Sequence, residues 1–340
     1  MKKLRTAILG CGRIGSRHAE KSKHAATLIA VCDILSDRAN SLAKKNDCTA
    51  FTSIDSFLAF CSEQSVDIVA VCTPNGLHCE HAIAALRSNL HVLCEKPMAL
   101  TFDDCQRMNI AAAKALKRLY VVKQNRFNEP VQKVKEVIEQ GALGRISNVQ
   151  LNCFWNRNSA YFEQDPWKGT FSLDGGTLFT QFSHFLDLMV WLLGEVRPLK
   201  ATRNNFFHKD LIEFEDGGVA LIEFENGAIG AVNYSICSFE KNFEGSLTIL
   251  GEKGTIKIGG QYLNELEYFH VENWEAPVLN KVANAANEYG HYQGSMSNHE
   301  DVYSDVLKAL HSNEEATIPE GVEASQLIKL IEGIYSEGAL

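Results

Sequence analysis

The sequence predicts an α/β protein of two domains: a doubly wound parallel sheet, followed by an α+β domain with a large, mostly antiparallel sheet. Three observations support this prediction. Short apolar strands alternate with helical stretches over the first 122 residues, later β-rich runs are joined by hairpin turns, and 340 residues are enough for two buried cores. We therefore expect one domain over residues 1–122 and a second over residues 123–340.

The predicted strands of the first domain are short and apolar on both faces, as expected of strands that helices cover on both sides. Their alternation with helices implies parallel crossovers. The strands are Leu4–Leu9, Leu28–Cys32, Val66–Val71, Leu90–Cys94 and Leu119–Val122, and the helices lie near Ile14–His24, Asp37–Lys45, Leu77–Arg87 and Phe102–Leu116.

The second domain is predicted to contain four helices among many strands. The helices are Val131–Gln140, an apolar helix over Gly176–Leu193, and two closing helices near His299–Leu310 and Gly321–Glu337. The strands are Ile146–Trp155, Leu211–Phe214, Val219–Phe224, Ala228–Cys237, Ser246–Gly251, Thr255–Ile258 and Tyr262–Val271. The polar stretch Asn280–Asn298 is predicted to be a long functional loop.

Composition argues against several classes of function. The formal net charge is -9, and an acidic surface repels phosphate backbones, so nucleic acid is not expected as a partner. No apolar run is long enough for a membrane span, and no signal peptide is recognised. The ten cysteines are scattered without CxxC pairs, which indicates a reducing, cytoplasmic location without disulfides or a zinc site.

A glycine fingerprint follows the first predicted strand. Gly10 suits a tight turn, Gly12 lets a pyrophosphate approach the backbone, and Gly15 lets the helix pack closely on the strand. Arg13 and Ile14 open the helix, whose free N–H groups favour phosphate. The fingerprint has the strand–turn–helix context that a dinucleotide site requires.

An acidic residue, Asp33, ends the second predicted strand. Its carboxylate can accept hydrogen bonds from both ribose hydroxyls of NAD and would repel a 2′-phosphate, so we expect NAD rather than NADP. The alternative is a glycine-rich turn with an unrelated surface aspartate.

Two further segments stand at the ends of predicted strands, where doubly wound sheets bind ligands. One contains Thr73, Pro74, Asn75 and His78, and the other is Glu95-Lys96-Pro97. A lysine at such a place can have its pKa lowered by burial and can exchange a proton with a hydroxyl. The alternative is an ordinary Glu-Lys surface pair. His78 and His81 could also suggest zinc, but no third ligand is recognisable, and we expect no metal.

These motifs together resemble the Gfo/Idh/MocA oxidoreductase family. The likeness continues through Gln124-Asn125-Arg126-Phe127, Gly175-Gly176-Thr177-Leu178 and His184-Phe185-Leu186-Asp187. The resemblance implies a Rossmann domain and a second domain whose open sheet mediates assembly, here into a homodimer or homotetramer. It also implies that Lys96 is catalytic, that Glu95 and Pro97 shape its loop, and that Thr73, Pro74, Asn75, His78, Glu95, Lys96 and Gln124 line the cofactor site.

The predicted helix Gly176–Leu193 carries a polar stripe on an otherwise apolar surface. Its members are Thr177, Thr180, His184, Asp187 and Trp191. A buried helix must satisfy such a stripe, and a cofactor–substrate cleft would do so. The alternative is a core histidine that is hydrogen-bonded to its neighbours.

Many family members carry an aspartate where this chain has Thr180, which cannot act as a base at neutral pH. Lys96 and His184 therefore remain as the expected proton-handling pair, meeting at the reactive carbon. Thr180 in place of aspartate resembles the branch that oxidises C3 of UDP-N-acetylglucosaminuronate or UDP-N-acetylglucosamine in lipopolysaccharide biosynthesis. Three segments share this resemblance: Arg157–Phe162, Asp165–Thr170 and His299–Tyr303.

Substrate contacts follow from that resemblance. Arg157 and Arg126 are expected to bind the anionic UDP-sugar, with Tyr161, Thr180, Lys96 and His184 at the sugar and Trp167 beside the nicotinamide. Each charge could instead be structural. Two other functions remain open: an NAD(P)-dependent dehydrogenase of a free sugar or polyol such as inositol, and a dinucleotide-binding regulator without turnover.

Overall fold

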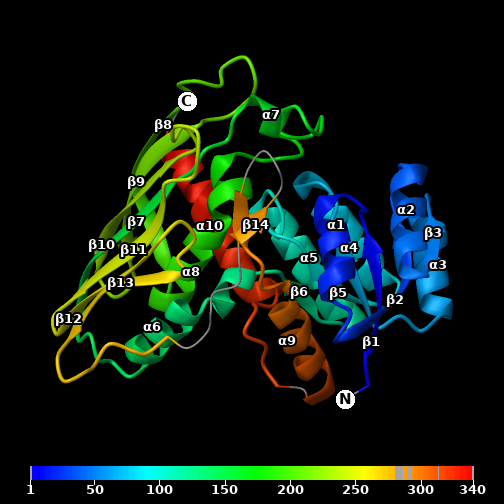
Figure 1. Ribbon diagram of the computed structural model, residues 1–340, viewed down its shortest axis with the longest axis horizontal. Coiled ribbons are helices and arrows are strands. Elements are labelled where there is room, and N and C mark those ends of the chain that lie inside the picture. The colour runs from blue at the N-terminus through cyan, green and yellow to red at the C-terminus, as the bar shows by residue number, and fades with distance from the viewer. Residues whose placement is uncertain (1, 280–285, 289–292, 313, 339–340) are drawn as a thin grey trace. The chain divides into compact units, whose positions relative to one another are not determined.

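The computed structural model describes residues 2–279, 286–288, 293–312 and 314–338 (Figure 1). The chain divides into two compact units. The first contains residues 1–123 and 299–328, and the second contains residues 124–298 and 329–340. The first unit is therefore discontinuous, because it also takes in a C-terminal segment.

The first unit contains a six-stranded parallel sheet with the order β3-β2-β1-β4-β5-β6. Its central strands, β1, β4 and β5, are almost entirely buried, because helices cover both faces. The strands are β1 (Leu4–Leu9), β2 (Ala26–Cys32), β3 (Thr49–Phe51), β4 (Ile68–Val71), β5 (His91–Cys94) and β6 (Leu119–Val121).

Strand order reverses direction between β1 and β4, which are neighbours in the sheet. Right-handed crossovers then place α1 (Arg13–Lys21) and α2 (Ser36–Asn46) on one face, and α3 (Ile54–Glu63), α4 (His78–Arg87) and α5 (Phe102–Ala115) on the other. Such a switch point is where doubly wound sheets bind ligands. The short helix η1 (Asn75–Leu77) precedes α4, and α9 (His299–Ser312) also belongs to this unit.

The second unit contains a seven-stranded sheet with the order β13-β12-β11-β7-β10-β9-β8, which is antiparallel except for the parallel pair β10 and β7 (Figure 1). One face carries alternating buried residues, as in β7 and β10, which fits a sheet with a single covered face. The strands are β7 (Ile146–Phe154), β8 (Val196–Asn204), β9 (Gly217–Phe224), β10 (Ile229–Ser235), β11 (Glu244–Gly251), β12 (Gly254–Gly259) and β13 (Glu265–Val271).

Helices of the second unit include α8 (Ser183–Leu193), which packs on the covered face through residues such as Phe185, whose ring meets Trp155 edge-on. A small sheet pairs β14 (Ala286–Glu288) with β15 (Gln293–Met296). The other helical segments are η2 (Gln124–Phe127), α6 (Glu129–Glu139), α7 (Ser159–Phe162) and η3 (Leu178–Phe182). The last helix, α10 (Gly321–Glu337), begins in the first unit and ends in the second.

The predicted fold class is confirmed, and several element predictions are wrong. Leu211–Phe214 is a turn rather than a strand, because the amide of Asn205 binds the carbonyls of Ile212 and Phe214. The sequence reasoning missed β3, α3, α7 and β8, and it placed both strands of the pair β14 and β15 in a long loop. The rest of that loop, residues 280–285 and 289–292, lies outside the described residues.

Candidate active site

The glycine-rich turn lies between β1 and α1 and has the geometry that the fingerprint predicts. Gly10 has a φ of 101°, and a Cβ there would lie 2.6 Å from the carbonyl oxygen of Cys72. A Cβ on Gly15 would lie 1.9 Å from the carbonyl oxygen of Gly10, so helix and turn are in direct contact. A Cβ on Gly12 would meet nothing within 4 Å, which leaves open space for a phosphate beside the helix N-terminus.

Asp33 follows β2 and is half-buried. Its Oδ2 accepts a hydrogen bond from the backbone N–H of Cys11 at 2.8 Å, and its Oδ1 accepts one from Leu35 at 2.9 Å. These two bonds hold the carboxylate beside the glycine-rich turn. The role of this carboxylate at the ribose of a dinucleotide stays a prediction from the sequence.

The segment after β4 is held by histidine side chains. His78 is buried, with Nε2 at 2.9 Å from the carbonyl oxygen of Thr73 and Nδ1 at 2.7 Å from that of Pro97. The Thr73 hydroxyl lies 2.9 Å from Nδ1 of His81. Burial lowers the pKa of both histidines, that of His81 to about 4. His78 therefore links the loop after β4 to the loop after β5, and both rings have protein partners that occupy ring nitrogens.

Glu95, Lys96 and Pro97 follow β5. Glu95 is buried and Lys96 is half-buried. The Glu95 carboxylate accepts a hydrogen bond from the backbone N–H of Lys96 at 3.0 Å, and the Lys96–Pro97 peptide bond is cis. The lysine thus stands in the first unit, at the ligand-binding edge of the parallel sheet.

The helix that carries His184 is not regular. A π-helical turn over Leu178–Phe182 precedes α8, and such turns are frequent at functional sites. His184 is buried, and its Nε2 lies 3.4 Å from the amide nitrogen of Gln124, which the sequence predicts at the cofactor. These two residues belong to the second unit and lie together.

The rest of the polar stripe binds groups inside the second unit. Thr177 donates to the carbonyl oxygen of Glu215 at 2.6 Å, and Thr180 donates to the carbonyl oxygen of Asp174 at 3.0 Å and also contacts its carboxylate. The stripe therefore does not face a single partner. Thr180 replaces a carboxylate in the family pattern, and Asp174 brings a buried carboxylate back to its hydroxyl.

Arg126 is 3% exposed and its guanidinium binds Asp187 at two points. Nε donates to Oδ2 at 2.9 Å and Nη2 donates to Oδ1 at 3.0 Å, while the group lies 4.9 Å from the Trp191 ring centroid. This geometry favours the structural reading of Arg126 over the substrate contact that the sequence suggests.

Arg157 and Tyr161 form one network. Arg157 is 2% exposed and donates from Nε to Gln181 at 2.6 Å and from Nη1 to Asn242 at 3.2 Å. The amide of Gln181 donates to the Tyr161 hydroxyl at 2.8 Å. Since Gln181 lies in the π-helical turn, this network positions that turn. Lys168 is buried beside it and donates to the carbonyl of Tyr161, and Trp167 is half-buried.

For three buried side chains of the first unit the sequence predicted no individual role, although the segment His299–Tyr303 carries part of the family resemblance: His18, His299 and Tyr303. Together with Glu95 they form a hydrogen-bonded cluster. His18 lies 77 residues and His299 lies 204 residues from Glu95 in the sequence, so no local motif predicts that these side chains meet. A hydrophilic residue on the buried face of α1, His18, is the one indication the sequence contains.

Among the described residues, two groups each bring together three side chains of the kinds that bind metals: His18 with Glu95 and His299, and His208 with Asp216 and Cys237. In the second group, Asp216 already accepts from His208 at 2.9 Å and from the backbone of Phe206 and Phe207, which holds its pKa near 2 although burial opposes this. The Asp216 carboxylate therefore has a structural role: it holds the loop that contains Phe206, Phe207 and His208. No described helix is long and apolar enough to cross a membrane.

Comparison with known proteins assigns both parts of the chain. Residues 4–123 match the model of the oxidoreductase family with an NAD-binding Rossmann fold, and residues 131–257 match the C-terminal domain of the same Gfo/Idh/MocA family. The ends of the first match agree with the contiguous part of the first unit.

Two solved structures are similar over nearly the whole chain. The WlbA dehydrogenase of Bordetella pertussis, in complex with NADH and UDP-GlcNAcA, is 34% identical with a TM-score of 0.86, covering 99% of this chain and 96% of that one. The WlbA dehydrogenase of Chromobacterium violaceum, with the same two ligands, is 33% identical with a TM-score of 0.88, covering 99% of this chain and 94% of that one.

Other relatives match over a smaller part of the chain, and their names give different substrates. A 1-carboxy-3-chloro-3,4-dihydroxycyclohexa-1,5-diene dehydrogenase of Comamonas testosteroni is 32% identical over 68% of this chain. The inositol 2-dehydrogenase of Salmonella typhimurium is 29% identical over 56% of this chain. The matching parts span 62% and 55% of these two relatives, respectively.

Proposed function

Because the chain belongs to the Gfo/Idh/MocA oxidoreductase family, we propose that it oxidises the C3 hydroxyl of a UDP-N-acetylhexosamine, or of its uronic acid, to a 3-keto sugar. The observation that carries this proposal is the similarity along the full chain to two dehydrogenases that bind NADH and UDP-GlcNAcA. Residues 4–123 form an NAD-binding Rossmann domain, and the geometry of Gly10, Gly12, Gly15 and Asp33 fits that cofactor.

The proposed chemistry is a proton transfer from the sugar to Lys96. When bound, NAD supplies a hydride acceptor for the hydrogen on C3. The Lys96 amine accepts the proton of the C3 hydroxyl, and we retain His184 as the second proton-handling residue that the sequence predicts. A positioned proton acceptor accelerates such a step by about 10²- to 10⁴-fold.

In this proposal, the second unit supplies the sugar contacts. Thr180, His184 and Tyr161 lie on or against the π-helical turn and α8, where they are held by Asp174, Gln124 and Gln181. We assign Arg157 an indirect role at the substrate site. Its hydrogen bond to Gln181 positions the π-helical turn. Its own burial makes it an indirect contributor, and the bidentate pair with Asp187 gives Arg126 a structural role.

The direct test is product analysis with the wild-type enzyme. The protein is incubated with NAD and, separately, UDP-N-acetylglucosaminuronate, UDP-N-acetylglucosamine and myo-inositol, with and without 2-oxoglutarate as a second oxidant. Mass spectrometry should detect a nucleotide sugar that has lost two hydrogen atoms. Detection of the product avoids a failure of absorbance assays, in which tightly held NADH is recycled and gives no net signal.

A second candidate, a free-polyol dehydrogenase, is favoured by the similarity to inositol 2-dehydrogenase over part of the chain. Oxidation of myo-inositol without oxidation of either UDP-sugar would select it. If none of the three substrates gives a keto product although NADH binds, the result would favour the dinucleotide-binding regulator without turnover that the sequence left open.

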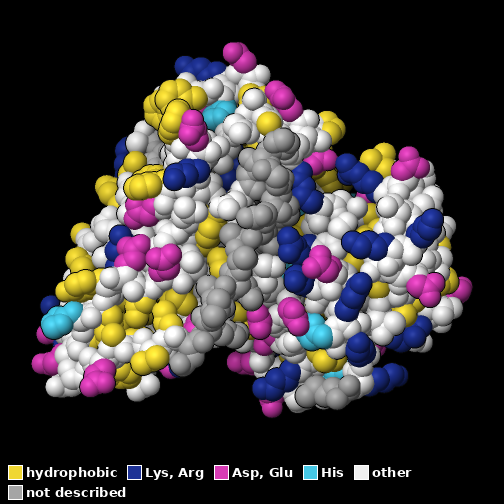
Figure 2. Space-filling view, in the orientation of Figure 1, with side chains coloured by type: hydrophobic (Ala, Val, Ile, Leu, Met, Phe, Trp, Pro, Cys, Tyr) yellow, Lys and Arg dark blue, Asp and Glu magenta, His cyan; other side chains and the backbone are white. Residues whose placement is uncertain are grey.

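We further propose a cytoplasmic homodimer or homotetramer acting in nucleotide-sugar metabolism, such as lipopolysaccharide synthesis. The ten cysteines all lie in the described part of the chain and none forms a disulfide, which suits a reducing compartment. In the second sheet, Val219, Leu221 and Ile229 are each 41% exposed or more, so this face carries apolar side chains that a second copy could cover. On the face shown in Figure 2, Lys and Arg side chains are interspersed with Asp and Glu. Light scattering measures the mass of the particle in solution and should give two or four times the mass of one chain.

A further inference from the structure

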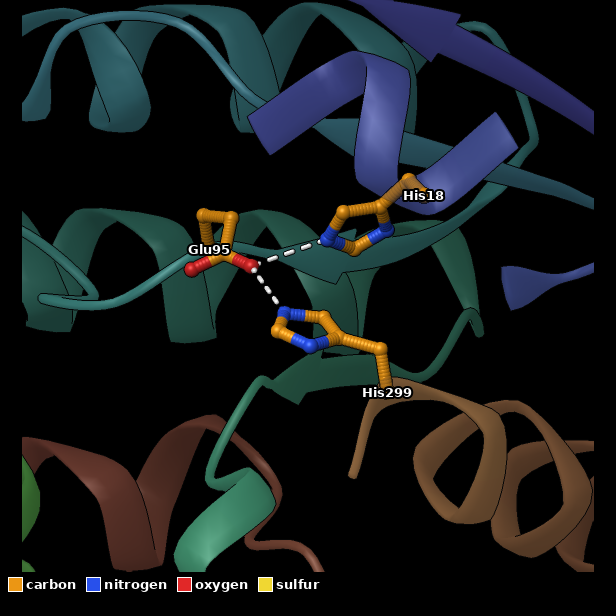
Figure 3. A group of neighbouring side chains, drawn as sticks. All are labelled: His18, Glu95 and His299. Atoms are coloured by element: carbon orange, nitrogen blue, oxygen red, sulfur yellow. Dashed lines mark hydrogen bonds and ion pairs between the residues drawn. The ribbon is translucent and has the colours of Figure 1, made fainter. Parts of the chain in front are cut away.

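A buried cluster in the first unit surrounds the carboxylate of Glu95 (Figure 3). Glu95 follows β5, His18 comes from α1, and His299 is the first residue of α9. Nε2 of His18 lies 2.8 Å and Nε2 of His299 lies 3.3 Å from the same oxygen, Oε1. Glu95 is 5% exposed, His18 0% and His299 1%, so water does not compete for these hydrogen bonds.

The two oxygens of Glu95 have different partners. Oε1 meets the two imidazoles, and Oε2 accepts the backbone N–H of Lys96 at 3.0 Å. A further contact fixes the first imidazole, because Nδ1 of His18 lies 2.8 Å from the hydroxyl of Tyr303 in α9. A chain of hydrogen bonds therefore runs from Tyr303 through His18 and Glu95 to the main chain of Lys96.

Charge in this cluster follows from its burial and its hydrogen bonds. Burial by itself would raise the pKa of Glu95, but the bonds from His18 and His299 hold that pKa well below its ordinary value. The ionised carboxylate can only accept hydrogen bonds, so both imidazoles present an N–H at Nε2. Burial lowers the pKa of His299 although its hydrogen bond to Glu95 opposes this, so the cluster favours the neutral form of this ring.

The distances favour this hydrogen-bonded arrangement over a metal site. A zinc ion would need each ligand atom about 2.0–2.2 Å away, with the ion between the ligands. Here both nitrogens approach one carboxylate oxygen directly, at donor–acceptor distances. The remaining nitrogen of His18 is also taken by Tyr303.

We propose that His18 and His299 are positioning residues for Lys96: they hold Glu95, which holds the backbone of the lysine. This inference rests on the proposed role of Lys96 as proton acceptor. A lysine side chain has a long flexible stem, so its amine is placed well only if its main chain is fixed. Loss of one donor loosens that main chain without removing any group that touches the sugar or NAD.

The pH dependence expected of this cluster depends on every group that faces Glu95. From α1 and α9 these are His18, His299 and Tyr303, and from the strand ends and their loops they are Cys72, Cys94 and His78, in addition to Lys96 itself. Removal of the His299 donor raises the pKa of Glu95, since one of the bonds that lowers it is gone. The protonated form then appears at a higher pH and weakens the hold on Lys96.

The test compares His299→Leu with His299→Gln in the full-length enzyme with NAD and UDP-N-acetylglucosaminuronate. Leucine fills the space without a donor, whereas the glutamine amide keeps an N–H toward Glu95. For His299→Leu we expect kcat to fall about 10- to 100-fold, while KM and the Kd for NADH change by less than about twofold. The acidic limb of kcat should move to higher pH, and His299→Gln should restore most of both properties.

Two results would overturn the proposal. One is wild-type kcat in His299→Leu, and the other is equal impairment of both variants with an unmoved acidic limb, as for a purely structural residue. If His299→Leu does not fold, Tyr303→Phe removes only the hydroxyl that meets His18, and it should move kcat and the limb in the same directions by less. Stoichiometric zinc in the purified enzyme, with activity lost on its removal, would replace this proposal with a metal site.

A readout without turnover separates this inference from the proposed function. In protein labelled with ¹⁵N-lysine, the Lys96 amide proton should resonate at low field because it binds a carboxylate. It should move upfield in His299→Leu and remain in place in His299→Gln. If wild-type enzyme makes no keto sugar, the proposed function fails while this shift still tests the positioning network, and an unmoved resonance rejects it.

Discussion

The carboxylate of Asp33 accepts a hydrogen bond from the backbone N–H of Cys11 at 2.8 Å, which holds it at the glycine-rich turn. The bond joins the end of β2 to the turn that follows β1. We propose that the same carboxylate accepts hydrogen bonds from the ribose hydroxyls of NAD.

Replacement of Asp33 should therefore relax the preference for NAD over NADP. Hydrogen bonds to a charged group contribute about 1.5–3 kcal/mol, so Asp33→Ser should lower the NAD/NADP ratio of kcat/KM by about 10- to 100-fold. Asp37→Ser, which removes an exposed carboxylate in α2, is the matched control and should leave the ratio unchanged. A ratio in Asp33→Ser equal to that of the wild type would refute the ribose assignment.

Arg126 should contribute to stability rather than to substrate affinity. Arg126→Met leaves the buried Asp187 carboxylate uncompensated, and breaking such a pair costs about 3–5 kcal/mol in the free energy of unfolding. Urea denaturation checks this value, and Arg126→Met/Asp187→Leu should recover much of the loss. A large rise in KM for the UDP-sugar with unchanged unfolding free energy would instead support the substrate contact suggested by the sequence.

Glu215 should make stability fall as the pH rises. This carboxyl is buried, with Oε1 at 2.7 Å from the Tyr335 hydroxyl, and burial raises its pKa from 4.5 to about 7. Between these two values the folded state keeps a proton that the unfolded state releases, so unfolding becomes easier by about 3 kcal/mol over that interval. Glu215→Gln keeps the shape without the charge, so its free energy of unfolding should lack this decline.

The pH test for Glu215 compares unfolding free energies of wild type and variant from about pH 5 to pH 8. The difference between them should change steadily in favour of Glu215→Gln as the pH rises. Glu225→Gln, at an exposed position in the turn before β10, is the control and should follow the wild type. Parallel curves for wild type and Glu215→Gln would show that this carboxyl does not titrate as described.

Local signals predicted the first domain well. The turn at Gly10 and the contact of Gly15 with that turn are set by neighbouring residues, so the fingerprint was sufficient to predict them. The same holds for the strand ends that carry Thr73 and Lys96, because parallel strands all end at one edge. The missed strand β3 has three residues, which is too short for a periodicity to be recognised.

Long-range packing accounts for what the sequence did not predict. His18 and Glu95 are 77 residues apart, and α9 returns to the first unit after the whole of the second sheet. The π-helical turn shifts the stripe that a regular helix would form, so Thr180 meets Asp174 and His184 meets Gln124. The burial of Arg126 and Arg157 likewise depends on partners that are distant in sequence, whereas the family resemblance favoured substrate contacts for both.

The central claim is that the Lys96 amine accepts the proton of the C3 hydroxyl, and turnover of Lys96→Met tests it most directly. Keto-sugar formation should fall by about 10²-fold or more while the Kd for NADH stays near that of the wild type. Lys96→Arg keeps the positive charge but cannot accept a proton at neutral pH, so it should be as inactive as the methionine variant. Turnover at the wild-type rate in Lys96→Met would contradict the account.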